Sequence, residues 1–217
     1  MKMTHPAMQE FDLNCTKCPR IANNLAKIRK QYPTYHARPV PPFGDSSPLL
    51  LIVGLGPGMH GANATGRPFT GDHAGILLYK MLFEFGFGNK PESHEINDGL
   101  SLNKCRITNA VKCLPPGNKP LNNEINNCNS YLRAELESLQ NKLVILALGR
   151  IAHEAVIRAL GIKQRAHPFS HNAVHELVSG RFLLDSYHCS RYNTQTKRLT
   201  EPMFRDIFKT ATKLLHG

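Results

Sequence analysis

The cysteines of this chain are the residues whose type and spacing most clearly indicate chemistry. Cys15 and Cys18 form a C-x2-C pair, and Cys113 and Cys128 form a wider C-x14-C pair far downstream. Four thiolates brought together by folding can bind zinc or an iron–sulfur cluster. Zinc sites usually combine two close pairs, so the wide second pair favours a 4Fe–4S cluster, with zinc as the alternative. Simple burial of some of these cysteines is the competing interpretation, and it is the one favoured for Cys105.

A second cysteine-containing stretch, YHCSRYNTQT, runs from Tyr187 to Thr196. It fits three interpretations: a metal site, a Cys/His nucleophilic pair, or a loop that contacts a negatively charged partner. A nucleophilic pair requires the thiol and the imidazole to face each other. His188 and Cys189 are adjacent, and neighbouring residues of an extended segment point to opposite faces. The hydrolase interpretation is therefore disfavoured.

A glycine-rich segment, GLGPGMHGANATGRPFTGDHAG, begins at Gly54 after an apolar run. Such a turn after a strand can bind phosphate through its backbone amides. This one lacks the Gly-Lys-Ser/Thr ending of a P-loop, and Pro57 has no amide hydrogen to donate. The segment is thus a poor nucleotide-binding loop, and its chemistry must come from its side chains.

Alternating apolar runs and amphipathic stretches predict the elements that position these residues. Strands are expected at 49–58, 105–113 and 142–149, helices at 74–87, 123–140 and 150–161, a basic helix after Cys18, and a hairpin at 173–188. This order predicts an α/β fold with a mostly parallel sheet. Ligands of such sheets bind at the carboxyl ends of the strands. Three segments meet this condition: those after Val53, at and after Asn109, and after Tyr187.

The composition predicts one domain with a basic surface. The chain has 217 residues and a formal net charge of +11, which favours a polyanionic partner such as nucleic acid over generic basicity. Residues 1–45 form a proline-containing N-terminal arm. Apolar runs are too short for a membrane span, and no signal peptide is recognised. A cytoplasmic protein without disulfides and without a membrane partner is expected.

Taken together, the motifs CTKCPR, ARPVPPFGD, GLGPGMHGANATGRPFTGD, ITNAVKCLPPGNKP, ALGRIA and YHCSRYNTQTKRLTEPM resemble the family 5 (type b) iron–sulfur enzymes of the uracil-DNA glycosylase superfamily. The resemblance implies a three-layer α/β/α sandwich around a central four-stranded parallel sheet. It implies one domain over 1–217, whose arm contributes two cluster cysteines, and a structural cluster on the four cysteines named above. The expected activity is excision of uracil and related deaminated bases, such as hypoxanthine and xanthine, from DNA, by a monomer. A non-enzymatic DNA-binding module carrying a cluster or zinc is the alternative.

The resemblance also assigns roles in base recognition. Phe69 is expected to stack on the base, Asn109 to read its edge, and His188 to stabilise the negative charge on the departing base. The backbone of the turn is expected to line the pocket through Leu55, Gly56, Pro57 and Gly58. The family typically carries Ala where Gly56 stands, so a wider pocket is hypothesised here.

Water activation is less defined, because Leu55 and Gly56 carry no group that can act as a base. Asn63 can position a water molecule and Asp72 can accept its proton, while His60 and Thr65 are further polar candidates. A dissociative reaction suits this set. It would begin with leaving-group stabilisation by His188, followed by water capture.

The residues after His188 are expected to contact DNA. They are Ser190, Arg191, Tyr192, Asn193 and Arg198. Their hydroxyl, amide and guanidinium groups suit phosphates and sugars. The family normally has proline at the position of Cys189, so a more mobile hinge is expected before this loop.

Overall fold

A six-stranded sheet forms the centre of the computed structural model, which describes residues 11–216. The start of the predicted N-terminal arm, residues 1–10, lies outside the described residues. The strands are β1 (Phe43–Gly44), β2 (Leu50–Gly54), β3 (Cys105–Asn109), β4 (Leu143–Leu148), β5 (Val174–Glu176) and β6 (Arg181–Ser186). Their order is β1-β3-β2-β4-β6-β5. The inner four strands are parallel, as predicted, and a short antiparallel strand borders each edge.

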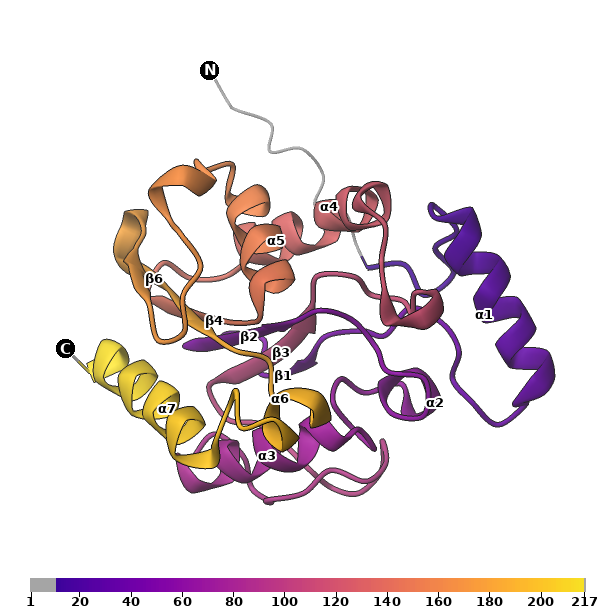
Figure 1. Cartoon of the computed structure of the whole chain (residues 1–217), viewed down its shortest axis with the longest axis horizontal. Coiled ribbons are helices and arrows are strands. Elements are labelled where there is room, and N and C mark those ends of the chain that lie inside the picture. Colours follow the sequence, from indigo (N-terminus) through magenta and orange to yellow (C-terminus); the bar gives the residue numbers. More distant parts are fainter. Residues whose placement is uncertain (1–10, 217) are drawn as a thin grey trace.

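Helices cover both faces of the sheet (Figure 1). They are α1 (Pro19–Gln31), α2 (Ala62–Thr65), α3 (His73–Glu84), α4 (Asn122–Ser138), α5 (Arg150–Leu160), α6 (Arg191–Gln195) and α7 (Glu201–His216), with 3-10 turns at Pro116–Asn118, Gln164–Ala166 and Val178–Gly180. The apolar side chains of α3 and α7 belong to one core, and those of α1, α4 and α5 to the other. The predicted three-layer sandwich is therefore confirmed.

Strand β2 shows why the central strands read as continuous apolar runs. Its residues alternate between the two cores: Leu50 and Ile52 face α3 and α7, whereas Leu51 and Val53 face the other layer. All of them are buried. A parallel strand covered on both faces has no polar side to show in its sequence.

Two elements differ from the sequence-based expectation. Strand β3 ends at Asn109 rather than at 113, because its partner β2 ends at Gly54 and the chain then follows the turn. Helix α7 was not predicted, although its buried Phe204, Ile207, Phe208, Ala211 and Leu215 have the 3.6-residue spacing of an amphipathic helix. Within residues 11–216, no helix combines the length and the hydropathy needed to cross a membrane.

Candidate active site

A cavity of about 660 Å³ opens at the carboxyl ends of the four parallel strands. Its walls come from the turn after β2, the end of β3, the start of α5 after β4, and the segment after β6. The lining residues are Leu55, Gly56, Pro57, Gly58, Phe69, Asp72, His73, Ala74, Asn109, Asn118, Leu148, Gly149, Arg150, Ile151, His188, Ser190 and Arg191. The structure thus brings together all seven residues for which a role at the base was expected.

Phe69 occupies its place in the wall through a strained backbone. Its φ of 57° lies in the left-handed region, which is unfavourable for a bulky side chain. Two glycines make room for it. A Cβ on Gly75 would lie 1.8 Å from the Phe69 carbonyl oxygen, and one on Gly54 would lie 2.8 Å from the Phe69 ring. The aromatic ring is therefore held by close backbone packing.

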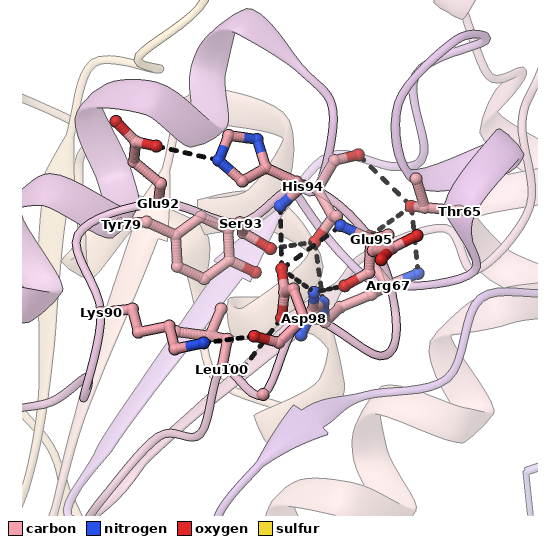
Figure 2. Close-up of polar contacts among 12 residues, drawn as sticks. Thr65, Arg67, Tyr79, Lys90, Glu92, Ser93, His94, Glu95, Asp98 and Leu100 are labelled. Carbon is pink, nitrogen blue, oxygen red and sulfur yellow. Dashed lines mark hydrogen bonds and ion pairs between the residues drawn. The ribbon is translucent and has the colours of Figure 1, made fainter.

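A polar network links the segment between α2 and α3, which includes Phe69, to the loop that follows α3 (Figure 2). The buried guanidinium of Arg67 pairs with Asp98 at 2.6 Å, and its Nε donates to Thr70 Oγ1 at 3.0 Å. Ser93 contacts the same threonine hydroxyl at 2.6 Å. Asp98 also accepts the backbone amides of His94, Glu95 and Leu100. We call Arg67, Thr70, Ser93 and Asp98 the Arg67 clasp.

Burial raises the pKa of an isolated carboxyl group, but the partners of Asp98 reverse that effect. Hydrogen bonds from Arg67 and from the amides of Leu100, His94 and Glu95 hold the pKa of Asp98 well below its ordinary value. Asp98 is therefore ionised at neutral pH. The clasp is a fully partnered ion pair that supports the segment between α2 and α3.

Asn109 lines the cavity and carries a buried polar atom without a partner. Its side chain is 2% exposed, and Oδ1 has no hydrogen-bond partner among the described residues. A buried acceptor without a partner is costly, and such atoms commonly await a ligand or an ordered water molecule. Asn109 can therefore accept a hydrogen bond from a bound molecule while its Nδ2 group donates another.

The rings of His188 and Phe69 both line the cavity and lie next to each other. The two ring centroids lie 6.0 Å apart with an interplanar angle of 25°. Burial lowers the pKa of His188 to about 4, so the imidazole is neutral at physiological pH. Its backbone is fixed by Asn193, whose Nδ2 donates to the His188 carbonyl at 2.8 Å. The site thus holds a neutral N–H donor.

The structure separates the two residues considered for water activation. Asp72 lines the cavity, and its Oδ2 accepts the amide of Ala62 at 3.2 Å. Burial raises the pKa of Asp72, while the Ala62 amide and His60 counteract that rise. Asn63 is fully buried and does not line the cavity, and its Oδ1 lacks a partner among the described residues. Only Asp72 therefore reaches the space in which a substrate would bind.

A Cβ added to Gly56 would not point freely into the cavity. Its nearest neighbour would be the Val111 carbonyl oxygen at 3.2 Å, followed by the Cys113 carbonyl oxygen at 3.7 Å. The space saved by glycine lies against this neighbouring segment. The absence of the methyl group therefore does not by itself widen the pocket.

The segment expected to contact DNA divides into outward and inward residues. Ser190 and Arg191 line the cavity, and Tyr192 is 70% exposed. Arg198 is exposed, with its guanidinium 4.8 Å from the Tyr187 ring centroid. Asn193 is half-buried, and its side-chain amide donates a hydrogen bond to the His188 carbonyl. Four of the five residues thus remain accessible.

Several lining residues were missed by the sequence reasoning. Arg150 directly follows β4, so the rule that ligands bind at strand carboxyl ends would have found it. Asn118 comes from the loop between Cys113 and Cys128 and has a φ of 56°. Its sequence context, PPGNKP, signals only a turn, and no local pattern indicates where that turn lies.

The four predicted ligand cysteines line one narrow cavity formed by the arm, α4 and the segment after β3. All four are free thiols. Burial, and then the proximity of the other three cysteines, raises the pKa of Cys113. Among the described residues, no three cysteine sulfurs lie within 4.8 Å of one another. Zn–S bonds of about 2.3 Å would bring tetrahedral sulfurs to about 3.8 Å apart. The four thiols share one cavity, as either a four-cysteine cluster or a four-cysteine zinc site requires.

Cys189 lies in the apolar core with α3 and α7 and is fully buried. Burial raises the pKa of its thiol to about 12. A reactive cysteine needs thiolate character and access to solvent, and Cys189 has neither. The geometry thus contradicts the hydrolase interpretation. Cys105 is also fully buried, in agreement with its expected place in the core.

Comparisons with known proteins agree with this geometry. The model of the uracil DNA glycosylase superfamily matches residues 41–212. A type-5 uracil-DNA glycosylase of Thermus thermophilus is 46% identical over 205 residues, which cover 92% of this chain and 93% of that protein. Proteins of the same name from Mycobacterium leprae and Pyrobaculum aerophilum are 43% and 40% identical over 92% of this chain, covering 91% and 88% of their own lengths. The chain therefore belongs to the uracil-DNA glycosylase superfamily, in its type-5 branch.

Proposed function

We propose that this enzyme excises uracil from DNA by hydrolysing the N-glycosidic bond, as the first step of base excision repair. The observation that carries the proposal is the meeting of Phe69, Asn109 and His188 in one cavity at the end of the sheet. These residues supply a stacking face, an edge reader and a neutral donor. Membership of the type-5 branch supports the same activity.

The target nucleotide has to leave the duplex before it can enter the cavity. Flipping a base costs a few kcal/mol, which contacts to phosphate must offset. The net charge of +11 suits such contacts. Ser190 and Arg191 line the cavity, and the exposed Tyr192 and Arg198 follow them along the chain. These residues would hold the DNA backbone or fill the space that the base leaves. Asn193 positions His188 instead.

Recognition of uracil follows from the unpartnered amide. Uracil offers an N–H donor flanked by carbonyl acceptors. Oδ1 of Asn109 would accept that N–H, and Nδ2 would donate to a carbonyl, while Phe69 stacks on the ring. The cavity of about 660 Å³ is large for a pyrimidine, and we include hypoxanthine and xanthine in the proposed substrate range on that basis.

His188 would supply the main chemical stabilisation. As the glycosidic bond breaks, its electron pair stays on the base, and negative charge develops on a base carbonyl. A neutral imidazole N–H directed at that oxygen stabilises it as an oxyanion-hole donor does. Because the pKa of His188 is about 4, the ring needs no proton from solvent for this role.

Asp72 would orient and deprotonate the water that attacks the sugar. Its carboxylate borders the cavity, and the amide of Ala62 fixes one of its oxygens. Asn63 was the other candidate. From its buried position beneath the turn, it would act on the shape of the turn rather than on the water.

A 4Fe–4S cluster on Cys15, Cys18, Cys113 and Cys128 is the proposed cofactor, and zinc is the less favoured occupant. The cluster would link the N-terminal arm to the loop that carries Asn118 into the active site. Its contribution would be structural, as a cross-link within a single domain. A monomer in the cytoplasm remains the prediction from sequence.

The deciding experiment uses oligonucleotides with one uracil, hypoxanthine or xanthine, in single strands and in duplexes, with an undamaged strand as control. Alkali-labile breaks at uracil, absent from the undamaged strand, are the expected result. Purified, cluster-loaded protein that leaves uracil intact in every context would contradict the proposal. Cleavage at uracil alone would restrict the substrate range and remove the two purines from it.

A further inference from the structure

A group of histidines surrounds one buried carboxylate outside the cavity. Asp185 on β6 is fully buried, and its Oδ1 lies 2.8 Å from Nδ1 of His153 on α5. Its other oxygen, Oδ2, lies 3.3 Å from Nε2 of His175 on β5. One ligand atom from each of the three residues lies within 4.8 Å of the other two, and no other such group occurs in residues 11–216.

The far side of His153 is already fixed by the backbone. Its Nε2 donates to the carbonyl of His167 at 2.9 Å, which directs Nδ1 toward Asp185. The same pattern repeats next to it, since Nδ1 of His167 bonds the carbonyl of Lys163 at 3.0 Å, and the His167 ring centroid lies 5.5 Å from that of His175. Histidines that bind metals are usually oriented in this way, by donating the second ring nitrogen to a carbonyl or carboxylate.

We propose that His153, His175 and Asp185 form a binding site for a divalent transition metal of the zinc class. Two imidazole nitrogens and one carboxylate oxygen are a ligand set that such ions prefer. The metal would also supply the positive charge that a fully buried carboxylate requires.

One of the two nitrogen–oxygen distances already suits a pair of ligands on one metal ion. Zn–N and Zn–O bonds of about 2.0–2.1 Å place tetrahedral ligands about 3.3 Å apart. The separation of His175 and Asp185 equals that value and exceeds the roughly 2.7–2.9 Å of a charge-assisted hydrogen bond. The His153–Asp185 pair is closer, and it would open by about half an ångström on metal binding.

The site would join three segments behind the cavity. It connects α5 to the hairpin of β5 and β6, and β6 leads directly to His188. The ring centroid of Phe169 lies 5.6 Å from that of His153. The guanidinium of Arg150 lies over the same phenyl ring, 5.3 Å from its centroid. Arg150 lines the cavity. A metal would thus stiffen the wall of the active site without touching the substrate.

Metal analysis tests the proposal on the whole purified protein. After incubation with zinc sulfate and desalting, we expect about one Zn²⁺ per chain in addition to iron. Asp185→Asn and His175→Ala should both lose this zinc and keep their iron. The matched control is His94→Ala, since His94 is exposed and pairs only with Glu92.

X-ray absorption at the zinc edge tests the wild-type protein without any variant, in case Asp185→Asn does not fold. Nitrogen and oxygen neighbours at about 2.0–2.1 Å are expected, whereas sulfur neighbours at about 2.3 Å would place the zinc on the cysteines and overturn the proposal. Zinc content at background level would also overturn it. The group would then be a buried ion pair in which a proton on His153 supplies the positive charge.

Discussion

The cavity and the Arg67 clasp both involve the segment between α2 and α3, yet their polar groups differ in whether they have partners within the protein. In the clasp, the buried Arg67 and the half-buried, ionised Asp98 pair with each other and with hydroxyl and backbone groups. In the cavity, Asn109 Oδ1 has no partner among the described residues, and His188 is held neutral by burial. The clasp has its partners within the protein, whereas the groups of the cavity are directed at space that a substrate can fill.

This difference separates stability from catalysis. A partnered buried network stabilises the fold and fixes the turn that carries Phe69. Unpartnered groups destabilise the free protein and are retained where a ligand satisfies them. Substitutions in the cavity should therefore reduce the reaction rate with little loss of stability. Substitutions in the clasp should do the reverse.

The largest effect is expected for His188→Ala. Loss of a donor to the developing negative charge should reduce uracil excision by about 100–1000-fold, while the free energy of unfolding changes by less than about 1 kcal/mol. Single-turnover rates on a uracil duplex and chemical denaturation measure the two quantities. Unchanged DNA binding with lost cleavage would also distinguish the enzyme from a mere DNA-binding module.

The pH dependence of the wild-type enzyme checks the same residue. Since burial lowers the pKa of His188 to about 4, its neutral form persists as the pH falls from about 7 to about 5. The rate at saturating enzyme should therefore stay level over this range as far as His188 is concerned. A His188-dependent loss of rate centred near pH 6.5 would contradict the assigned protonation state.

The clasp should show the opposite pattern in Asp98→Asn. Asparagine cannot accept at both positions, so the Arg67 pair and the amide contacts are weakened, with a loss of about 2 kcal/mol in unfolding free energy. The pKa of Asp98 is depressed by folding, so its contribution is present above about pH 4 and is lost as the pH falls below that value. The difference between wild type and variant should shrink toward acid pH.

A surface ion pair provides the matched control for the clasp. Asp206 pairs with Lys209 at 2.8 Å, and both side chains are more than half exposed. Asp206→Asn should change the free energy of unfolding by less than about 0.5 kcal/mol. Equal losses in the two variants would show that the buried position of the clasp contributes nothing.

The contrast between the cavity and the clasp also explains which parts of the structure could be predicted from the sequence. The sheet was predictable, because the buried strands β2 and β4 are uninterrupted apolar runs. The base contacts expected of Phe69 and Asn109 came from the resemblance to the family, because neither residue alone distinguishes a base contact from core packing or a strand-end cap. The clasp was not predicted, since Arg67 and Asp98 are 31 positions apart and neither has a local pattern that names its partner.

The directions of the Asn63 and Cys189 side chains could not be predicted from the sequence either. Asn63 is a polar residue in the motif, yet the short helix α2 turns its side chain into the interior. Cys189 adjoins His188, yet it packs into the core. In both cases the direction of one side chain depends on tertiary packing, which spacing along the chain does not encode.

A smaller effect on the excision rate is expected for substitution of Asp72. Asp72 borders the cavity but also holds the amide of Ala62, so it belongs partly to each region. Asp72→Asn should reduce the rate by about 10–100-fold, because the amide cannot accept a proton from water. Asn63→Ala should reduce stability more than rate, since Asn63 does not line the cavity. A larger rate loss in Asn63→Ala would transfer the role in water activation to Asn63.

The smallest effect is expected for Cys189→Ala, although Cys189 directly follows His188, the proposed donor to the departing base. Its side chain points into the core with α3 and α7, and burial raises its pKa to about 12, so it takes no part in the chemistry. Removing the sulfur leaves a small void that should lower the free energy of unfolding by about 1 kcal/mol, with the excision rate within about two-fold of wild type. Loss of excision in a folded Cys189→Ala protein would mean that core packing beneath His188 sets its position. Core packing at Cys189 and chemistry at the adjacent His188 would then be coupled.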